Sequence, residues 1–164
     1  MTSRGVAGSA AIFQDCQVLV VSENKFTWQL LKSLLPAIGV RFVATSHSNA
    51  DAESRIKVGL FDALIIDVGP AAHIDAPALI ACVRSMPDSR EAQTPVVMLV
   101  SNASEDLIYT ARKSGVSHII AKPFTPAALY AHVESALLQS IHARGRHRGE
   151  CPRVNPEACS AWEV

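Results

Sequence analysis

The sequence predicts an α/β fold, doubly wound around a five-stranded parallel sheet in the order 2-1-3-4-5. Short apolar runs that do not alternate with polar residues recur along the chain, which is typical of parallel strands covered on both faces. Helical patterns lie between these runs, so a strand–helix pair is repeated five times with right-handed crossovers. With 164 residues, the chain is long enough for one such domain.

Five segments are expected to form the strands. Four are continuous apolar runs, and the second strand in chain order is a weaker segment that Phe42 and Val43 support. In order, the strands are Gln17–Val21, Arg41–Thr45, Ala63–Ile66, Val96–Val100 and His118–Ala121.

The helices between the strands are predicted from apolar stripes and from the capping residues at their N-termini. The first, Phe26–Ile38, is expected to bury one stripe and to end near Gly39. Its stripe consists of Leu30, Leu31, Leu34, Leu35 and Ile38. The other four helices are expected to start at Ser48 with Asp51 and Glu53, at Asp75–Ala76–Pro77, at Asn102 with Glu105, and at Thr125–Pro126.

The folded domain is expected to span residues 16–141, between a flexible segment 1–15 and a flexible basic tail 142–164. Lys and Arg together number 15, as do Asp and Glu, so the net charge gives no reason to expect a nucleic-acid partner. The apolar patch near the N-terminus is too weak for a signal peptide, and no run approaches the roughly 20 residues of a membrane helix. We therefore expect a soluble cytoplasmic protein without a membrane partner.

Three ionisable residues follow strands whose carboxyl ends share one edge of the sheet: Glu23, Asp67 and Lys122. That edge is where open α/β sheets bind their ligands. Two carboxylates suit a magnesium ion, lysine suits a phosphoryl oxygen, and a carboxylate can attack phosphorus to form an acyl phosphate. Each residue alone could be a solvated loop charge or part of a structural ion pair, but their arrival at one edge favours a site.

Four segments resemble response-regulator receiver domains of two-component signalling, in the right order and spacing. The resemblance extends over roughly Gln17 to Leu138. The segments are Val-Leu-Val-Val-Ser-Glu-Asn-Lys from Val18, Phe-Asp-Ala-Leu-Ile-Ile-Asp ending at Asp67, Pro-Val-Val-Met-Leu-Val-Ser-Asn-Ala-Ser from Pro95, and Ser-Gly-Val-Ser-His-Ile-Ile-Ala-Lys-Pro-Phe from Ser114.

The resemblance implies the flavodoxin-like receiver fold and a signalling phosphoacceptor rather than an enzyme. A histidine kinase or histidine phosphotransfer protein would phosphorylate Asp67, and a downstream protein would read the product. The resemblance also implies Mg²⁺ held by Asp67, Glu23 and the backbone carbonyl of Gly69, with Ser22 acting through a water. Lys122 would pair with the phosphoryl group, and its bond to the following proline is expected to be cis.

The sequence departs from the receiver pattern at several site positions. Ser22 replaces an acid and Glu23 replaces an aspartate, while the turn from Asp67 to the following proline is one residue short. Val100 stands where a Ser or Thr usually binds the phosphoryl group. Ser101 is adjacent, but neighbouring strand residues face opposite ways. Ile119 stands at the aromatic switch position.

These departures leave two functions open. One is a phosphorylation-competent receiver, and the other is a degenerate pseudo-receiver that acts as a phosphorylation-independent protein-interaction module. A nucleotide or flavin enzyme is not favoured, because the acidic turn after the first strand has no glycine for a phosphate loop. Trp28, near that turn, is expected either to anchor a partner or to pack against the last helix.

Overall fold

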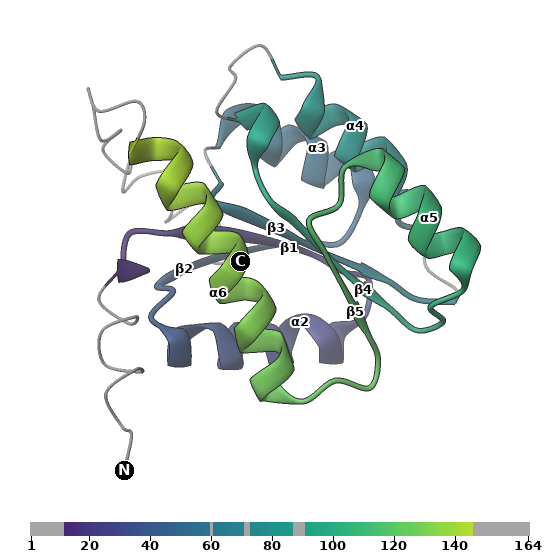
Figure 1. Cartoon of the computed structure of the whole chain (residues 1–164), viewed down its shortest axis with the longest axis horizontal. Helices are drawn as coiled ribbons and strands as arrows, with labels where there is room; N and C mark the ends of the chain where they lie inside the picture. The colour runs from purple at the N-terminus through teal and green to yellow at the C-terminus, as the bar shows by residue number, and fades with distance from the viewer. Residues whose placement is uncertain (1–11, 60, 71–72, 87–90, 146–164) are drawn as a thin grey trace.

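The computed structural model describes residues 12–59, 61–70, 73–86 and 91–145, and it shows a five-stranded sheet (Figure 1). The strand order is β2-β1-β3-β4-β5, and every neighbouring pair is parallel. The predicted fold class and strand order are therefore confirmed.

The strands lie close to their predicted positions. Their bounds are β1 (Gln17–Val21), β2 (Phe42–Ser46), β3 (Ala63–Val68), β4 (Val96–Val100) and β5 (His118–Ala121). The third strand continues two residues beyond the predicted end, because Asp67 and Val68 still pair in register with Leu99 and Val100. Asp67 is thus held by the sheet and not by a loop.

Helices cover both faces of the sheet (Figure 1). The helical segments are α2 (Lys25–Leu34), the 3-10 turn η1 (Leu35–Ile38), α3 (Asn49–Val58), α4 (Ala76–Arg84), the 3-10 turn η2 (Glu91–Gln93), α5 (Glu105–Ser114) and α6 (Pro126–Gly145). Helices α2 and α6 cover one face, and α3, α4 and α5 cover the other. Each layer has its own buried apolar cluster, centred on Leu31, Leu129 and Leu137 in the first and on Leu64, Leu79 and Ile80 in the second.

Two helix predictions need correction. The apolar stripe of the first helix is narrower than expected, because Leu31, Leu35 and Ile38 are buried while Leu30 is 45% exposed. Leu30 lies about 100° around the helix axis from Leu31, which places it on the flank. The cap of α5 is Ser104, whose Oγ accepts the Leu107 N–H at 3.2 Å, and not Asn102.

The other three predicted helix starts are correct. Ser48 accepts the Asp51 N–H at 3.2 Å, Asp75 accepts the Ala78 N–H at 3.0 Å, and Thr125 accepts the Ala128 N–H at 3.1 Å. The Lys122–Pro123 bond is cis, as predicted.

The described structure includes residues outside the predicted limits of 16 and 141 at both ends. Phe13 lies within the segment expected to be flexible, yet it is only 1% exposed and packs in the α2–α6 cluster. Helix α6 runs to Gly145, four residues beyond the expected boundary at 141. The rest of the predicted basic tail lies outside the described residues. No helix in the described ranges is both long and apolar enough to cross a membrane.

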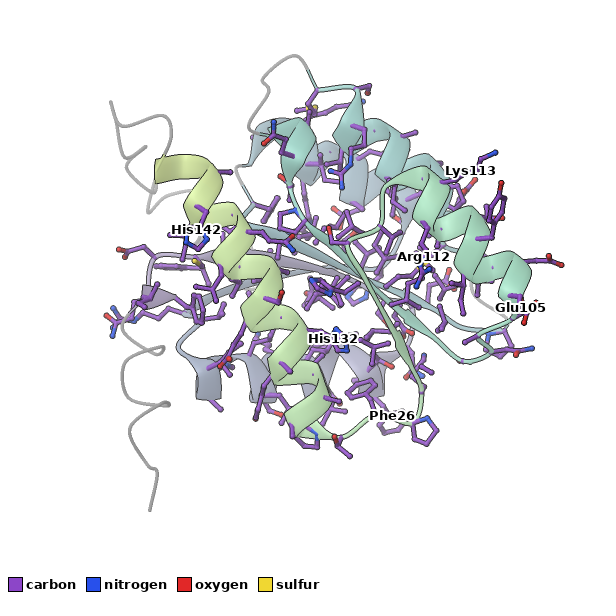
Figure 2. All side chains as sticks on the ribbon, viewed as in Figure 1. Phe26, Glu105, Arg112, Lys113, His132 and His142 are labelled. Carbon is purple, nitrogen blue, oxygen red and sulfur yellow. The ribbon has the colours of Figure 1, made fainter. Side chains whose placement is uncertain are left out.

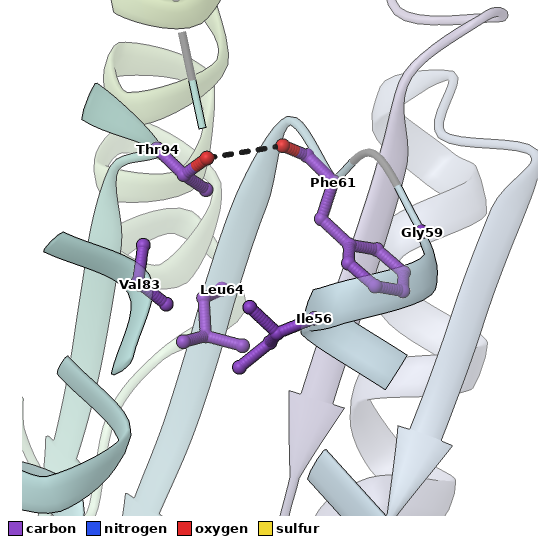
Figure 3. Close-up of a pocket in the computed structure, with 6 residues that line it drawn as sticks. All are labelled: Ile56, Gly59, Phe61, Leu64, Val83 and Thr94. Carbon is purple, nitrogen blue, oxygen red and sulfur yellow. Dashed lines mark hydrogen bonds between the residues drawn. The ribbon is translucent and has the colours of Figure 1, made fainter. Parts of the chain in front are cut away.

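A small apolar cavity of about 10 Å³ lies between α3, α4 and the start of β3 (Figure 3). It is lined by Ile56, Gly59, Phe61, Leu64, Val83 and Thr94. Thr94 Oγ1 donates to the Phe61 carbonyl at 3.4 Å across its rim. The volume suits about one water molecule, and the cavity lies at the amino-terminal edge of the sheet. The cavity therefore lies at the edge of the sheet opposite to the one where Asp67 and Lys122 are predicted to meet.

Candidate functional site

Asp67 and Lys122 meet at the carboxyl edge of the sheet. Asp67 lies near the end of β3 and is 3% exposed. Lys122 directly follows β5, where its backbone N–H donates to the Val100 carbonyl at 2.8 Å. The Lys122 ammonium forms an ion pair with Asp67 Oδ1, and the lysine side chain is only 21% exposed. Because the pair is largely removed from water, removing either partner would leave an uncompensated charge.

The Ser22 hydroxyl donates a hydrogen bond to the second carboxylate oxygen of Asp67. Ser22 follows β1 and is fully buried, and its Oγ lies 2.8 Å from Asp67 Oδ2. The Asn24 carbonyl is a weaker alternative acceptor at 3.2 Å, and the single hydroxyl proton favours the carboxylate. Ser22 Oγ in turn accepts the Asn24 N–H at 3.0 Å. Both oxygens of Asp67 therefore have a donor from the protein.

Glu23 lies at the exposed rim of this site and bridges two loops. Its Oε2 accepts the backbone N–H of His73 at 2.8 Å. The carboxylate thus ties the turn after β1 to the segment that leads into α4. Lys122 and Ser22 each contact Asp67, whereas Glu23 forms its hydrogen bond with the neighbouring loop.

The residues at this edge offer the oxygen ligands that magnesium prefers. Asp67 and Glu23 supply carboxylates, and Gly69, half-buried just after β3, supplies a backbone carbonyl. Within the described ranges no group of three or more His, Cys, Asp and Glu side chains could hold a metal. The set fits a magnesium ion that keeps several waters. Because Ser22 donates to Asp67 Oδ2, its hydroxyl would have to turn away before a cation could take that oxygen.

The two positions predicted to correspond to a receiver's switch, Val100 and Ile119, carry apolar side chains. Val100 is fully buried and packs in the cluster on the α3–α4–α5 face. Ser101, one residue beyond β4, is exposed. Ile119 is half-buried against the same cluster as Val100. The side chains at these two predicted switch positions therefore pack in the core and offer neither a hydroxyl nor an aromatic ring.

Sequence reasoning missed the role of His47. Its Nδ1 lies 2.9 Å from the Ser22 carbonyl, and its ring centroid lies 5.6 Å from that of Trp28. His47 follows the weakest predicted strand and carries no motif. Only the pairing of β1 with β2 in space places it beside the site. Trp28 itself is partly buried against the α2–α6 cluster, which supports the packing interpretation.

Comparison with known proteins gives a family match. The model of the response regulator receiver domain matches residues 18–134. The chemotaxis protein CheY1 of Helicobacter pylori is 26% identical over 121 residues, which cover 74% of this chain and 96% of that protein. The transcription factor SKN7 of Candida albicans is 26% identical over 137 residues, which cover 84% of this chain and 23% of that protein.

Solved structures agree with this match. A putative response regulator from Chloroflexus aurantiacus has a TM-score of 0.66 and 27% identity, over 75% of this chain and 98% of that chain. The receiver domain of a sensor histidine kinase from Pseudomonas aeruginosa has a TM-score of 0.64 and 20% identity, over 74% of this chain and 97% of that chain. That structure holds a magnesium ion in its active-site cleft.

Proposed function

Since this chain belongs to the response regulator receiver domain family of two-component signalling, we propose that it accepts a phosphoryl group on Asp67. The observation that carries the proposal is the environment of that carboxylate. Asp67 is buried at the end of a central strand, with the Lys122 ammonium on one oxygen and the Ser22 hydroxyl on the other. A carboxylate so placed is a fixed nucleophile beside a fixed positive charge.

The donor would be a phosphohistidine of a histidine kinase or of a histidine phosphotransfer protein. An oxygen of Asp67 forms a bond to phosphorus as the phosphorus–nitrogen bond breaks, and the imidazole leaves with the bonding electron pair. Lys122 turns from the carboxylate to an oxygen of the transferred group, so its charge stays compensated. When bound, Mg²⁺ would add positive charge beside the phosphoryl oxygens, held by Asp67, Glu23 and the Gly69 carbonyl, with Ser22 acting through a water.

The start of α2 offers a surface to which a protein donor could bind. Phe26, the second residue of α2, is 82% exposed (Figure 2), and Leu30, one helical turn further along, is 45% exposed. Large apolar side chains exposed beside a site are typical of an interaction surface. We propose that the donor covers these two side chains while its histidine reaches Asp67, and that this transfer occurs in the cytoplasm. A downstream protein would then read the phosphorylated state.

The experiment is incubation with acetyl phosphate and Mg²⁺, followed by measurement of intact-protein mass. We expect a gain of one phosphoryl group in the unmodified protein and none in Asp67→Asn. Asp62→Asn is the matched control, because Asp62 is also buried but lies before β3, where it accepts the Gln17 N–H at 2.7 Å. This variant should still gain the phosphoryl group.

Absence of the mass gain from the unmodified protein would contradict the proposal. The chain would then be a phosphorylation-independent interaction module. The apolar side chains at the predicted switch positions would support this interpretation, because Val100 has no hydroxyl to bind a phosphoryl group and Ile119 has no aromatic ring.

A further inference from the structure

We infer that His47 is a positioning residue for Asp67, acting through the backbone of Ser22. The inference rests on the proposed function, because its main readout is the phosphorylation of Asp67.

The backbone of Ser22 forms hydrogen bonds with Ser46, the last residue of β2, and with His47, which follows it. The Ser22 N–H donates to the Ser46 carbonyl at 2.9 Å, and the Ser22 carbonyl lies 2.9 Å from His47 Nδ1. Because a carbonyl can only accept, Nδ1 of His47 carries the proton in this contact. Two consecutive residues at the end of β2 therefore fix both the amide and the carbonyl of Ser22.

The side chain of Ser22 in turn contacts the carboxylate of Asp67. The Ser22 side chain is fully buried and short, so its hydroxyl reaches Asp67 Oδ2 only while its backbone stays in place. A displacement of the Ser22 backbone moves the oxygen that orients the nucleophile. Displacements on the order of 1 Å in such groups are enough to slow a positioned reaction.

The ring of His47 is itself supported by the indole of Trp28. His47 is exposed, but it lies against Trp28 at a ring-centroid distance of 5.6 Å and an interplanar angle of 54°. Trp28 is anchored in the α2–α6 cluster and stands between the exposed Phe26 and Leu30 along the helix. The indole thus holds the imidazole over the Ser22 turn. A partner that covers the start of α2 would cover residues on both sides of this support.

Two substitutions at His47 separate this role from a general effect on the loop. In asparagine, Nδ2 is the same number of bonds from Cβ as Nδ1 is in histidine, so His47→Asn keeps a donor toward the Ser22 carbonyl. In His47→Gln the donor is one bond further away, where Nε2 of histidine would be. The two amides are otherwise alike, so a difference between them reports the hydrogen bond.

The experiment measures the initial rate of phosphorylation by acetyl phosphate at fixed Mg²⁺. We expect His47→Ala and His47→Gln to slow the reaction about two- to tenfold, the range that one neutral hydrogen bond covers. His47→Asn should stay within about twofold of the unmodified protein. In a Ser22→Ala background, His47→Ala should have no further effect, because the hydroxyl through which it acts is gone.

Two rate results would overturn the inference. One is an unchanged phosphorylation rate in His47→Ala. The other is that His47→Ala slows phosphorylation by the same factor in the unmodified protein and in the Ser22→Ala background. The second result would mean that His47 acts by another route.

A separate readout covers the case in which the unmodified protein takes no phosphoryl group. The Asn24 N–H donates to Ser22 Oγ at 3.0 Å, so its hydrogen exchange reports the position of that oxygen. We expect faster exchange at Asn24 in His47→Ala and His47→Gln but not in His47→Asn, with the Leu64 amide of β3 unchanged as an internal control. Equal Asn24 exchange in all four proteins would overturn the role of His47, whatever the fate of the proposed function.

Discussion

Replacing Ser22 by aspartate should convert the site from weak to strong magnesium binding. The unmodified site carries one net negative charge, because Glu23 and Asp67 contribute two and Lys122 offsets one. Ser22→Asp raises the net negative charge to two. The new carboxylate would stand where the hydroxyl now lies, 2.8 Å from Asp67 Oδ2.

The magnitude follows from Coulomb's law in a partly solvated site. Two unit charges 4 Å apart interact by about 4 kcal/mol at an effective dielectric constant near 20. Without a cation, this repulsion is offset by Lys122 and by rotation of the new side chain, and we expect a loss of about 1–3 kcal/mol in the free energy of unfolding. With magnesium the added attraction, weakened by an intervening water, should lower Kd about 10- to 100-fold.

The assay is thermal denaturation in EDTA and across a magnesium titration, with Kd measured by calorimetry. Ser22→Asp should melt below the unmodified protein in EDTA, and saturating Mg²⁺ should recover the difference, since a ligand at about 100 times its Kd stabilises by about 2.7 kcal/mol. Ser22→Asn is the control, because it has nearly the shape of aspartate without the charge. Equal magnesium dependence of the aspartate and asparagine variants would refute the electrostatic reasoning.

Three further predictions concern the surroundings of the site. Val100→Thr restores a hydroxyl at the carboxyl edge and should speed phosphorylation by acetyl phosphate, at a cost of about 1 kcal/mol in stability for the buried hydroxyl; an unchanged initial rate would contradict this. Burial and the charge of His132 lower the pKa of His118, whose Nε2 is buried without a partner. The unfolded chain therefore binds a proton at His118 more readily than the folded chain does, so the free energy of unfolding should fall as the pH drops below about 6.5. In His118→Val, the free energy of unfolding measured by urea denaturation should depend less on pH. Arg84 donates to three backbone carbonyls, so Arg84→Met should lower the free energy of unfolding, measured by urea denaturation, by about 2–4 kcal/mol, whereas Met at the exposed Arg112 should change it little.

Much of the fold could be read from the sequence because the strands are buried on both faces. Val18–Val21 and Val96–Val100 are continuous apolar runs with no competing helical pattern, and both strands form as predicted. The exposure of Leu30 could not be read in the same way. Its side chain belongs to the apolar pattern of the helix, and only the packing of η1 after α2 shows which residues of the stripe face the core.

The site was only partly predictable, for a different reason. Strand ends predict that Asp67 and Lys122 share an edge, because parallel strands bring their carboxyl ends together. Hydrogen bonds of individual loop atoms follow no such rule. The hydrogen bond of Ser22 to Asp67 and the bond of Glu23 to the His73 amide both depend on loop geometry.

The central claim is that Asp67 is the residue that accepts the phosphoryl group, and residue-level mapping tests it most directly. The protein would be treated with acetyl phosphate and Mg²⁺, reduced with borohydride to trap an acyl phosphate, and digested for peptide mass analysis. We predict that the modification lies on Asp67 in the β3 peptide and that Asp67→Asn removes it. A modification on another residue, or an unmodified Asp67 peptide from a protein that binds Mg²⁺, would contradict the account.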